Sequence, residues 1–386
     1  MRKLVIKDWQ IVFAILVVVF GVIMFYVMCK SDLPAHVHIA QEKLSDGDYW
    51  NGNFLMYTLL NLFSGFSGEE NLMRGILCVM LAAATTFKYV ITKRVFLCFS
   101  NSRTATFMAL SMLFVFVIPI KPFVFFENAT NMYYGYYVPN VWHNSTIIFL
   151  FPFAIWLYFL SVRQISEFDN ARNYLMILLV VINVFIKPSF FFIFLSAYPL
   201  VLLWQYGFTK SFWNGLMPIA VGMICMAHVY LTIYEDATDG SSVVISFSQL
   251  FTLDFWKSKL LYLFDSLVLP LFFCIVYRKQ CFRDVEFFYI VLLLLAAIGI
   301  YWCCTETGPR ATHGNFYWQV VPAVWLLFYY MLKICTKQNE TKRNETKRNK
   351  TKQLPIIFKI IVFLYGAHVV MGVIYLIRFI VCRNYI

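Results

Sequence analysis

The chain has 386 residues, of which 61% are hydrophobic and only 13% carry a charge. A soluble domain is about 45–50% apolar and about 25% charged, so this composition would leave too much apolar surface facing water. The net charge of +12 would suggest a nucleic acid partner in a soluble protein, but in a membrane protein it reflects basic cytoplasmic loops. We therefore expect a single transmembrane domain over residues 1–386 and no nucleic acid partner.

Apolar runs of about 20 residues, the length that crosses a bilayer, predict about eleven membrane-spanning helices in an all-α fold. The first run is too long for the core of a signal peptide and no A-x-A site follows it, so we expect an uncleaved anchor. The predicted spans, in chain order, are 9–29, 71–92, 104–121, 146–162, 173–187, 189–206, 212–234, 258–277, 285–303, 316–335 and 355–377.

Most of the 32 Lys and Arg residues, Lys88 among them, fall on the side of the membrane that holds the N-terminus, and most acidic residues fall on the other side. This bias predicts an N-terminus inside and a multi-pass protein of a cell membrane. Residues 336–353 hold a basic repeat that begins at Asn339 with the letters NETKR and recurs every five residues. Such a polar segment predicts a solvated inner loop that can contact anionic membrane lipids.

The first outer loop, residues 30–70, carries Asp32, Pro34 and His36 directly after the first span. Pro34 in a first turn and Asp32 near the cap predict a short helix with Asp32 and His36 on one face. The apolar stretch 53–66 is too short to span and predicts a helix lying in the membrane interface. An Asp at the membrane boundary beside an imidazole can take a proton from a hydroxyl, and an ordinary helix cap is the structural alternative.

The same loop contains Asp46-Gly47-Asp48, a D-x-D pattern. Two carboxylates with this spacing can hold a divalent cation that bridges phosphate oxygens. Two acids around a glycine are also typical of a turn. Asp46 and Asp48 are therefore weak candidates for a metal site, and metal dependence stays open.

The second outer loop ends at the sequence Trp142-His143-Asn144, where the fourth span begins. His143 and Asn144 can cap the free N–H groups of that helix or can hold a phosphate at its N-terminus, and both interpretations stay open. Lys187 stands before Pro188 at the outer end of the fifth span. Its side chain can snorkel to the interface or contact an anionic headgroup.

The fourth outer loop runs from Cys304 to Asn315 and is the densest in polar groups. Its two glycines and one proline predict a short loop that brings Glu306, Arg310, His313 and Asn315 close together. Arg310 is the best candidate for holding a phosphate through bidentate hydrogen bonds, and a structural ion pair with Glu306 is the alternative.

The chain resembles the GT-C superfamily of polytopic glycosyltransferases, which use a polyprenyl-phosphate-linked sugar donor outside the cytoplasmic membrane. The shared features are the uncleaved first helix, an acidic residue soon after it in a large outer loop with interfacial helices, and charge gathered on the outer face. The stretches DLPAH from Asp32, WHNST from Trp142 and ETGPR from Glu306 also resemble motifs of bacterial surface-polysaccharide membrane proteins. The resemblance therefore implies a bacterial inner membrane as the location.

The resemblance implies transfer of a sugar to an acceptor hydroxyl in cell-surface glycan synthesis, by direct displacement with inversion and with Asp32 as the catalytic base. It implies that Lys187, Arg310, His143 and Asn144 hold the donor phosphate and that His36, Glu306, His313 and Asn315 shape the pocket. The implied partners are a polyprenyl-phosphate-linked sugar donor, a glycan or lipid-linked acceptor and membrane lipids. No cofactor is implied with certainty, and a divalent cation stays open.

Two other functions fit the same sequence. A polysaccharide polymerase or ligase would join lipid-linked oligosaccharides by similar chemistry. A lipid-linked glycan transporter would need charges at mid-membrane and two related halves, and the sequence shows no convincing halves and little charge there apart from Asp265. A shared active site requires Asp32, His143 and Arg310 to lie together in the folded chain.

Overall fold

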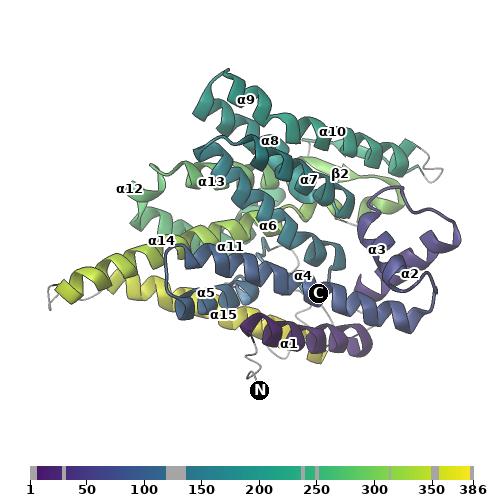
Figure 1. Ribbon diagram of the computed structural model, residues 1–386, viewed down its shortest axis with the longest axis horizontal. Coiled ribbons are helices and arrows are strands. Elements are labelled where there is room, and N and C mark those ends of the chain that lie inside the picture. The colour runs from purple at the N-terminus through teal and green to yellow at the C-terminus, as the bar shows by residue number, and fades with distance from the viewer. Residues whose placement is uncertain are drawn as a thin grey trace.

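The computed structural model describes residues 7–27, 32–118, 136–235, 240–247, 252–312, 314–348 and 356–382. They form a helical bundle whose long helices run along its long axis (Figure 1). The helices are α1 (Asp8–Val22), α2 (Asp32–Ser45), α3 (Leu55–Phe63), α4 (Glu70–Leu97), α5 (Ser102–Phe114), α6 (Ser145–Ser166), α7 (Asn170–Ile186), α8 (Ser189–Tyr206), α9 (Lys210–Gly215), α10 (Met217–Tyr230), α11 (Leu253–Val276), α12 (Arg278–Cys281), α13 (Val285–Cys303), α14 (Val320–Arg348) and α15 (Ile356–Cys382).

Nine helical segments in this part of the chain are long and apolar enough to cross a membrane, which supports a multi-pass membrane protein. Two of the eleven predicted spans are helical but shorter: α5 has 13 residues and α7 has 17. α7 ends at Ile186 because Pro188 disfavours a helical backbone at Lys187, which is extended instead. The expectation of many apolar helices is therefore confirmed, whereas the count of eleven is not.

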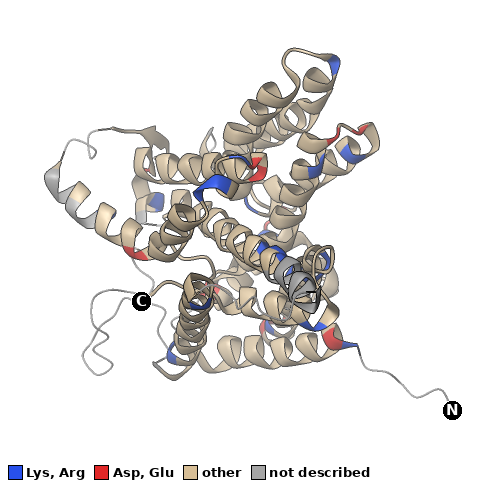
Figure 2. Cartoon of the chain, turned by 90° about the vertical axis from the view of Figure 1, so that its left-hand side faces the viewer, with Lys and Arg blue, Asp and Glu red and all other residues tan. Residues whose placement is uncertain are grey.

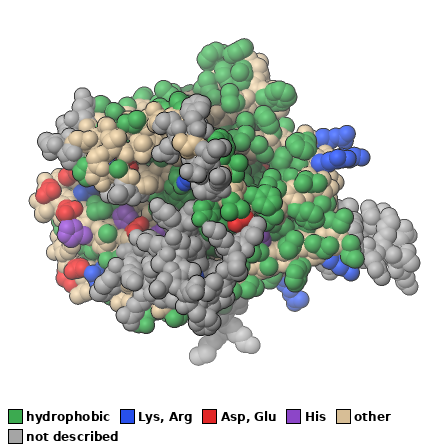
Figure 3. All heavy atoms as spheres, turned by 180° about the vertical axis from the view of Figure 1, so that it is seen from behind, with side chains coloured by type: hydrophobic (Ala, Val, Ile, Leu, Met, Phe, Trp, Pro, Cys, Tyr) green, Lys and Arg blue, Asp and Glu red, His purple; other side chains and the backbone are tan. Residues whose placement is uncertain are grey.

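Polar loops gather at one end of the bundle. Short connections make successive helices antiparallel, so alternate connections meet at the same end. α2, α3 and β2 lie at one end, which we call the site end, while α9 and α12 lie at the opposite end (Figure 1). Acidic and histidine side chains gather mainly at the site end and basic ones at the opposite end (Figure 3). Viewed from the opposite end, Lys and Arg stand mainly near helix ends (Figure 2).

Two short strands join loops at the site end and make the fold nearly, rather than strictly, all-α. β1 (Val243–Ile245) and β2 (Cys304–Glu306) pair antiparallel, with Val243 opposite Glu306. The two loops lie side by side, so their backbone N–H and C=O groups form hydrogen bonds with each other, as those of a helix do internally. Composition favours helices and could not reveal this pairing between distant loops.

The first outer loop folds largely as predicted. A helix begins at Asp32, and a second one, α3, lies within the stretch 53–66. α2 packs against α3 and α4, and α3 also packs against α7. Buried Asn61 of α3 donates a hydrogen bond to the Ala40 carbonyl of α2 at 3.0 Å, so the two short helices form one unit. This unit covers the site end of the bundle.

The basic repeat differs from the loop predicted for residues 336–353. α14 continues to Arg348, so the backbone is helical through the first two copies of the repeat. Lys, Glu and Arg are good helix formers, and the preceding apolar turns of α14 supply the nucleus that a polar segment lacks by itself. Residues 349–353 lie outside the described part of the chain.

Lys88 lies inside the bundle rather than on the inner side, where the charge bias predicts it. Its side chain is buried in α4, and its Nζ donates to Asn140 Oδ1 at 2.6 Å. The ammonium also lies 3.3 Å from the ring centre of Phe151 and 5.3 Å from that of Trp325. A hydrogen bond and two aromatic faces offset part of the cost of burying this charge.

Asn140 connects Lys88 to the end of α5. It belongs to the buried, non-helical stretch 136–144. Its Nδ2 donates to the carbonyl oxygens of Met112 at 3.2 Å and Val115 at 2.8 Å. The polar groups of a buried, non-helical backbone need partners within the protein, and Asn140 supplies a donor to the carbonyl oxygens of Met112 and Val115.

We expect Asn140→Ala to destabilise the protein by about 3 kcal/mol, because it leaves the Lys88 ammonium buried without a hydrogen-bond acceptor. Adding Lys88→Met to that variant should restore part of the stability, since it removes the stranded charge. Thermal unfolding of the purified protein in detergent measures both effects. Equal unfolding temperatures for the single and the double variant would show that Lys88 does not depend on Asn140.

Candidate active site

Asp32 begins α2 and contacts the start of α6. Asn144 Nδ2 donates to Asp32 Oδ2 at 3.2 Å. Asn144 is also the N-cap of α6, where its Oδ1 accepts a hydrogen bond from Ile147 N at 3.0 Å. One amide therefore satisfies the helix N-terminus with its oxygen and the carboxylate with its nitrogen. Capping and contact with Asp32 are both present at Asn144.

The surroundings of Asp32 raise the pKa of its carboxyl group. Burial raises the pKa of Asp32, while the positive charge of Lys187 and the hydrogen bond from Asn144 act in the opposite direction. Burial has this effect because it removes the water that stabilises the ionised carboxylate. A carboxylate with a raised pKa accepts a proton more readily than an ordinary Asp, as a general base requires.

Lys187 lies between α7 and α8 and is buried. Its Nζ donates to Thr146 Oγ1 at 3.3 Å and lies 5.3 Å from the ring centre of Trp318. Burial lowers the pKa of Lys187 to about 8, so the amine is mostly charged at neutral pH and neutral in mild alkali. A partly desolvated ammonium of this kind attracts a phosphate more strongly than a hydrated one.

His36 is held by Tyr57 of α3. Its Nδ1 and the Tyr57 hydroxyl are 2.8 Å apart and share a hydrogen bond. Burial, helped by the charge of Lys187, lowers the pKa of His36 to about 3. Burial also raises the pKa of Tyr57, although the charge of Arg310 opposes this. Both groups are thus neutral at physiological pH and supply hydrogen bonds rather than charge.

Glu306 is the centre of a second group of polar side chains and is only 4% exposed. It accepts hydrogen bonds from Arg310 Nε at 2.8 Å, from Asn315 Nδ2 at 2.6 Å and from the Tyr234 hydroxyl at 2.5 Å. Burial acts to raise the pKa of Glu306, but these hydrogen bonds outweigh it and hold the pKa below its usual value. Glu306 is therefore an ionised carboxylate whose charge Arg310 balances.

Backbone geometry fixes where Glu306 points. Glu306 ends β2, and Gly308 follows it with a φ of 66°. A Cβ at Gly308 would lie 3.2 Å from the backbone of Gly240. Glycine is needed here both for the positive φ and for the close approach of the two loops. The prediction that this loop brings Glu306, Arg310 and Asn315 close together is confirmed.

Electrostatic interactions link the two groups of side chains. The charge of Lys187 interacts with those of Asp32, Glu306 and Arg310. Tyr57 is within electrostatic reach of both Asp32 and Arg310. We call the set the polar cluster; its members are Asp32, His36, Tyr57, Asn144, Lys187, Tyr234, Glu306, Arg310 and Asn315. The charges of Asp32, Lys187 and Arg310 therefore interact, and the shared site of Asp32, His143 and Arg310 stays a prediction.

His143 adjoins the polar cluster as a neutral group. It is buried, and its Nδ1 shares a hydrogen bond of 3.2 Å with the Tyr375 hydroxyl of α15. Its ring centre lies 5.9 Å from that of Trp318, the residue that also contacts Lys187. Burial lowers the pKa of His143 to about 3. Any contact of His143 with a phosphate would thus rest on hydrogen bonding rather than on charge.

The D-x-D acids are engaged in the turn that follows α2. Asp48 Oδ2 pairs with Lys43 Nζ at 2.9 Å, and its Oδ1 accepts a hydrogen bond from Asn51 N at 3.1 Å. These contacts favour the turn interpretation of Asp46 and Asp48. Within the described ranges, no group of three or more His, Cys, Asp or Glu side chains is arranged to hold a metal ion. His313 lies outside those ranges.

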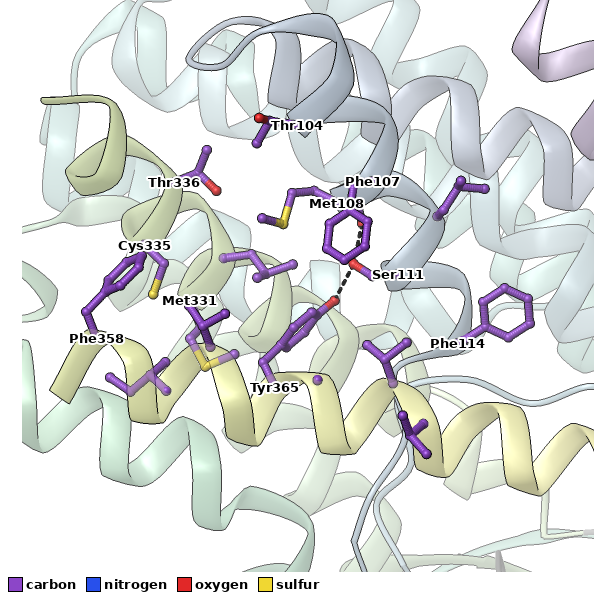
Figure 4. Close-up of a pocket in the computed structure, with 17 residues that line it drawn as sticks. Thr104, Phe107, Met108, Ser111, Phe114, Met331, Cys335, Thr336, Phe358 and Tyr365 are labelled. Atoms are coloured by element: carbon purple, nitrogen blue, oxygen red, sulfur yellow. Dashed lines mark hydrogen bonds between the residues drawn. The ribbon is translucent and has the colours of Figure 1, made fainter. Parts of the chain in front are cut away.

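A separate cavity of about 570 Å³ lies between α5, α14 and α15. Figure 4 shows its apolar lining, with Ser111 and Tyr365 joined by a hydrogen bond of 2.8 Å between their hydroxyls. None of its lining residues belongs to the polar cluster. The cavity lacks charged groups and therefore offers no acid, base or phosphate ligand.

Sequence reasoning missed two members of the polar cluster. Tyr57 and Tyr234 both bond to predicted residues, His36 and Glu306. The chain has 24 tyrosines, so no single one stands out by type. Their positions within an interfacial and a spanning helix gave no signal, because tyrosines at the membrane boundary are common for other reasons.

Comparisons of the chain with protein-family models, with curated proteins and with solved structures give no match. A desolvated carboxylate can accept a proton, two cations can hold an anion, and neutral hydrogen-bond partners can orient a substrate.

The lowered pKa of Lys187 predicts a pH dependence of stability. Between about pH 8, its folded pKa, and its ordinary value, the unfolded chain binds more protons than the folded one, so stability should rise with pH in this window. Thermal unfolding from pH 7 to pH 10.5 measures the slope. Lys187→Met should flatten it, and an unchanged slope in that variant would contradict the assignment.

Proposed function

We propose that this protein is a membrane glycosyltransferase that moves a sugar from a polyprenyl-phosphate-linked donor to an acceptor hydroxyl on the extracytoplasmic face. The observation that carries the proposal is the partly buried Asp32 carboxylate, bonded to Asn144 and within electrostatic reach of Lys187. The charges of the proposed base and of one proposed phosphate ligand thus interact. The charge asymmetry of the bundle, with acidic groups at the site end, supports an extracytoplasmic position for the site.

The proposed reaction is a direct displacement at the anomeric carbon. Asp32 takes the proton of the acceptor hydroxyl, whose oxygen forms the new bond to that carbon. The bond between the carbon and the phosphate oxygen breaks, and the electron pair leaves with the polyprenyl phosphate. Lys187 and Arg310 stabilise the charge that develops on the phosphate, which lowers the barrier because this charge is greater in the transition state than in the donor.

Arg310 keeps donors for this role although it is paired with Glu306. The ion pair uses Nε, and a guanidinium has further N–H groups on its two terminal nitrogens. Glu306 and the ring of Tyr234, 5.5 Å from the guanidinium carbon, fix the plane of the group. Such fixing reduces the entropy lost when a phosphate binds.

The contacts of Lys88 favour sugar transfer over the alternative function of a lipid-linked glycan transporter. A buried cation in a spanning helix is a feature that a transporter would use. Lys88 is bonded to Asn140 and lies over the Phe151 ring, which gives it a structural role. The charged side chains that interact with one another, Asp32, Lys187, Glu306 and Arg310, lie in the polar cluster instead.

The Asp32→Asn variant should lose transfer by a factor of about 100 to 10,000, because asparagine cannot accept the hydroxyl proton. The assay uses membrane vesicles that carry a lipid-linked sugar, with transfer to an added acceptor as the readout. Expression and insertion should match the unaltered protein, since asparagine is close in size.

Asp46→Asn is the matched control for this experiment, because it changes an acid on the same loop that stands outside the polar cluster. It should retain transfer. Full activity of Asp32→Asn would refute the base assignment, and loss of activity in Asp46→Asn with chelator sensitivity would point to a metal at the D-x-D turn instead.

A further inference from the structure

A second cavity, which is polar and has a volume of about 350 Å³, lies at the site end and is lined in part by the fourth loop. Its walls come from the start of α11, the end of α13, β2 and the turn that precedes α14, with Lys259, Tyr301, Trp302, Asn315, Phe316 and Tyr317 among the lining residues. Its volume falls within the range of small-molecule sites, about 300–1,000 Å³. The cavity shares Glu306 and Asn315 with the polar cluster.

Lys259 supplies a positive charge to this cavity. Its Nζ donates to the Tyr301 hydroxyl at 2.9 Å and lies 4.7 Å from the Tyr301 ring centre. Across the ranges that the structure describes, no carboxylate forms an ion pair with Lys259. An ammonium has three N–H donors, so two are left for a ligand. The ligand that suits them is an anion.

Aromatic rings form the other walls and are held rigidly. The Tyr301 and Tyr317 rings meet edge to face with their centres 5.3 Å apart. Trp302 Nε1 donates to the Tyr137 hydroxyl at 2.7 Å, which fixes the indole. Rigid aromatic faces suit the C–H faces of sugar rings, and the amide of Asn315 suits sugar hydroxyls.

We propose that this cavity binds a sugar unit carrying an acidic group, as part of the acceptor glycan. The acid would contact Lys259, the sugar ring would lie on the aromatic walls, and Asn315 would bond to a hydroxyl. The inference deepens the proposed function and rests on it, because the shared wall of Glu306 and Asn315 places such a sugar next to the polar cluster. The acidic group is a carboxylate or a phosphate, which both match an ammonium.

The test is a binding measurement that needs no transfer activity. The full chain, purified into nanodiscs of phosphatidylcholine, is titrated by calorimetry with methyl glucuronide, glucose 6-phosphate and neutral methyl glucoside. At least one acidic probe should bind more tightly than the neutral one, and the tighter acid identifies the group. Lys259→Gln should weaken acidic binding about ten-fold or more and leave neutral binding unchanged.

Three further variants make the result decisive. Lys259→Arg should keep the preference for acid, which separates loss of charge from misfolding. Lys279→Gln, at an exposed lysine of α12, should bind like the unaltered protein. Asp32→Asn should also keep the preference for acid. A failure of the proposed transfer chemistry can then be told apart from a failure of acid binding in this cavity. Equal binding of acidic and neutral probes, or an acid preference that survives in Lys259→Gln, would overturn the inference.

Discussion

The hydrocarbon core of a bilayer offers no hydrogen-bond partner to the backbone, and this constraint organises the rest of the structure. It makes long helices the default, and short connections make neighbouring helices antiparallel. Segments far apart in the sequence are then carried to the same end of the bundle. Asp32, Asn144, Lys187 and Glu306 follow or precede different helices, yet they meet because each stands at a site-end connection.

Charges gathered in this way can persist only when each has a partner. Asp32 has the amide of Asn144, and Glu306 has Arg310, Asn315 and Tyr234. Lys187 balances both carboxylates electrostatically. The same rule explains Lys88, which is held by Asn140 and by the faces of the Phe151 and Trp325 rings. Partly desolvated charges with few partners are reactive or ligand-seeking, whereas fully bonded ones are structural.

The candidate site was predictable to the extent that its residues stand out by type. Asp32, Lys187 and Arg310 are charges in a chain that has few, and their place next to helix ends marked them. Tyr57 and Tyr234 could not be found in this way, because their role comes from which helix packs beside α2 and β2. Lys88 was placed wrongly, because a charge count along the chain cannot tell a helix end from a buried position several turns inside it.

The sequence by itself determined the membrane class, the approximate helix boundaries and the set of polar residues that need partners, because hydropathy and proline or glycine signals act locally. Only the tertiary structure decided which residues meet. Pairing of β1 with β2, the bond from Asn144 to Asp32 and the burial of Lys88 depend on packing between distant segments. Such contacts are set by the global arrangement of helices, which no short stretch of sequence encodes.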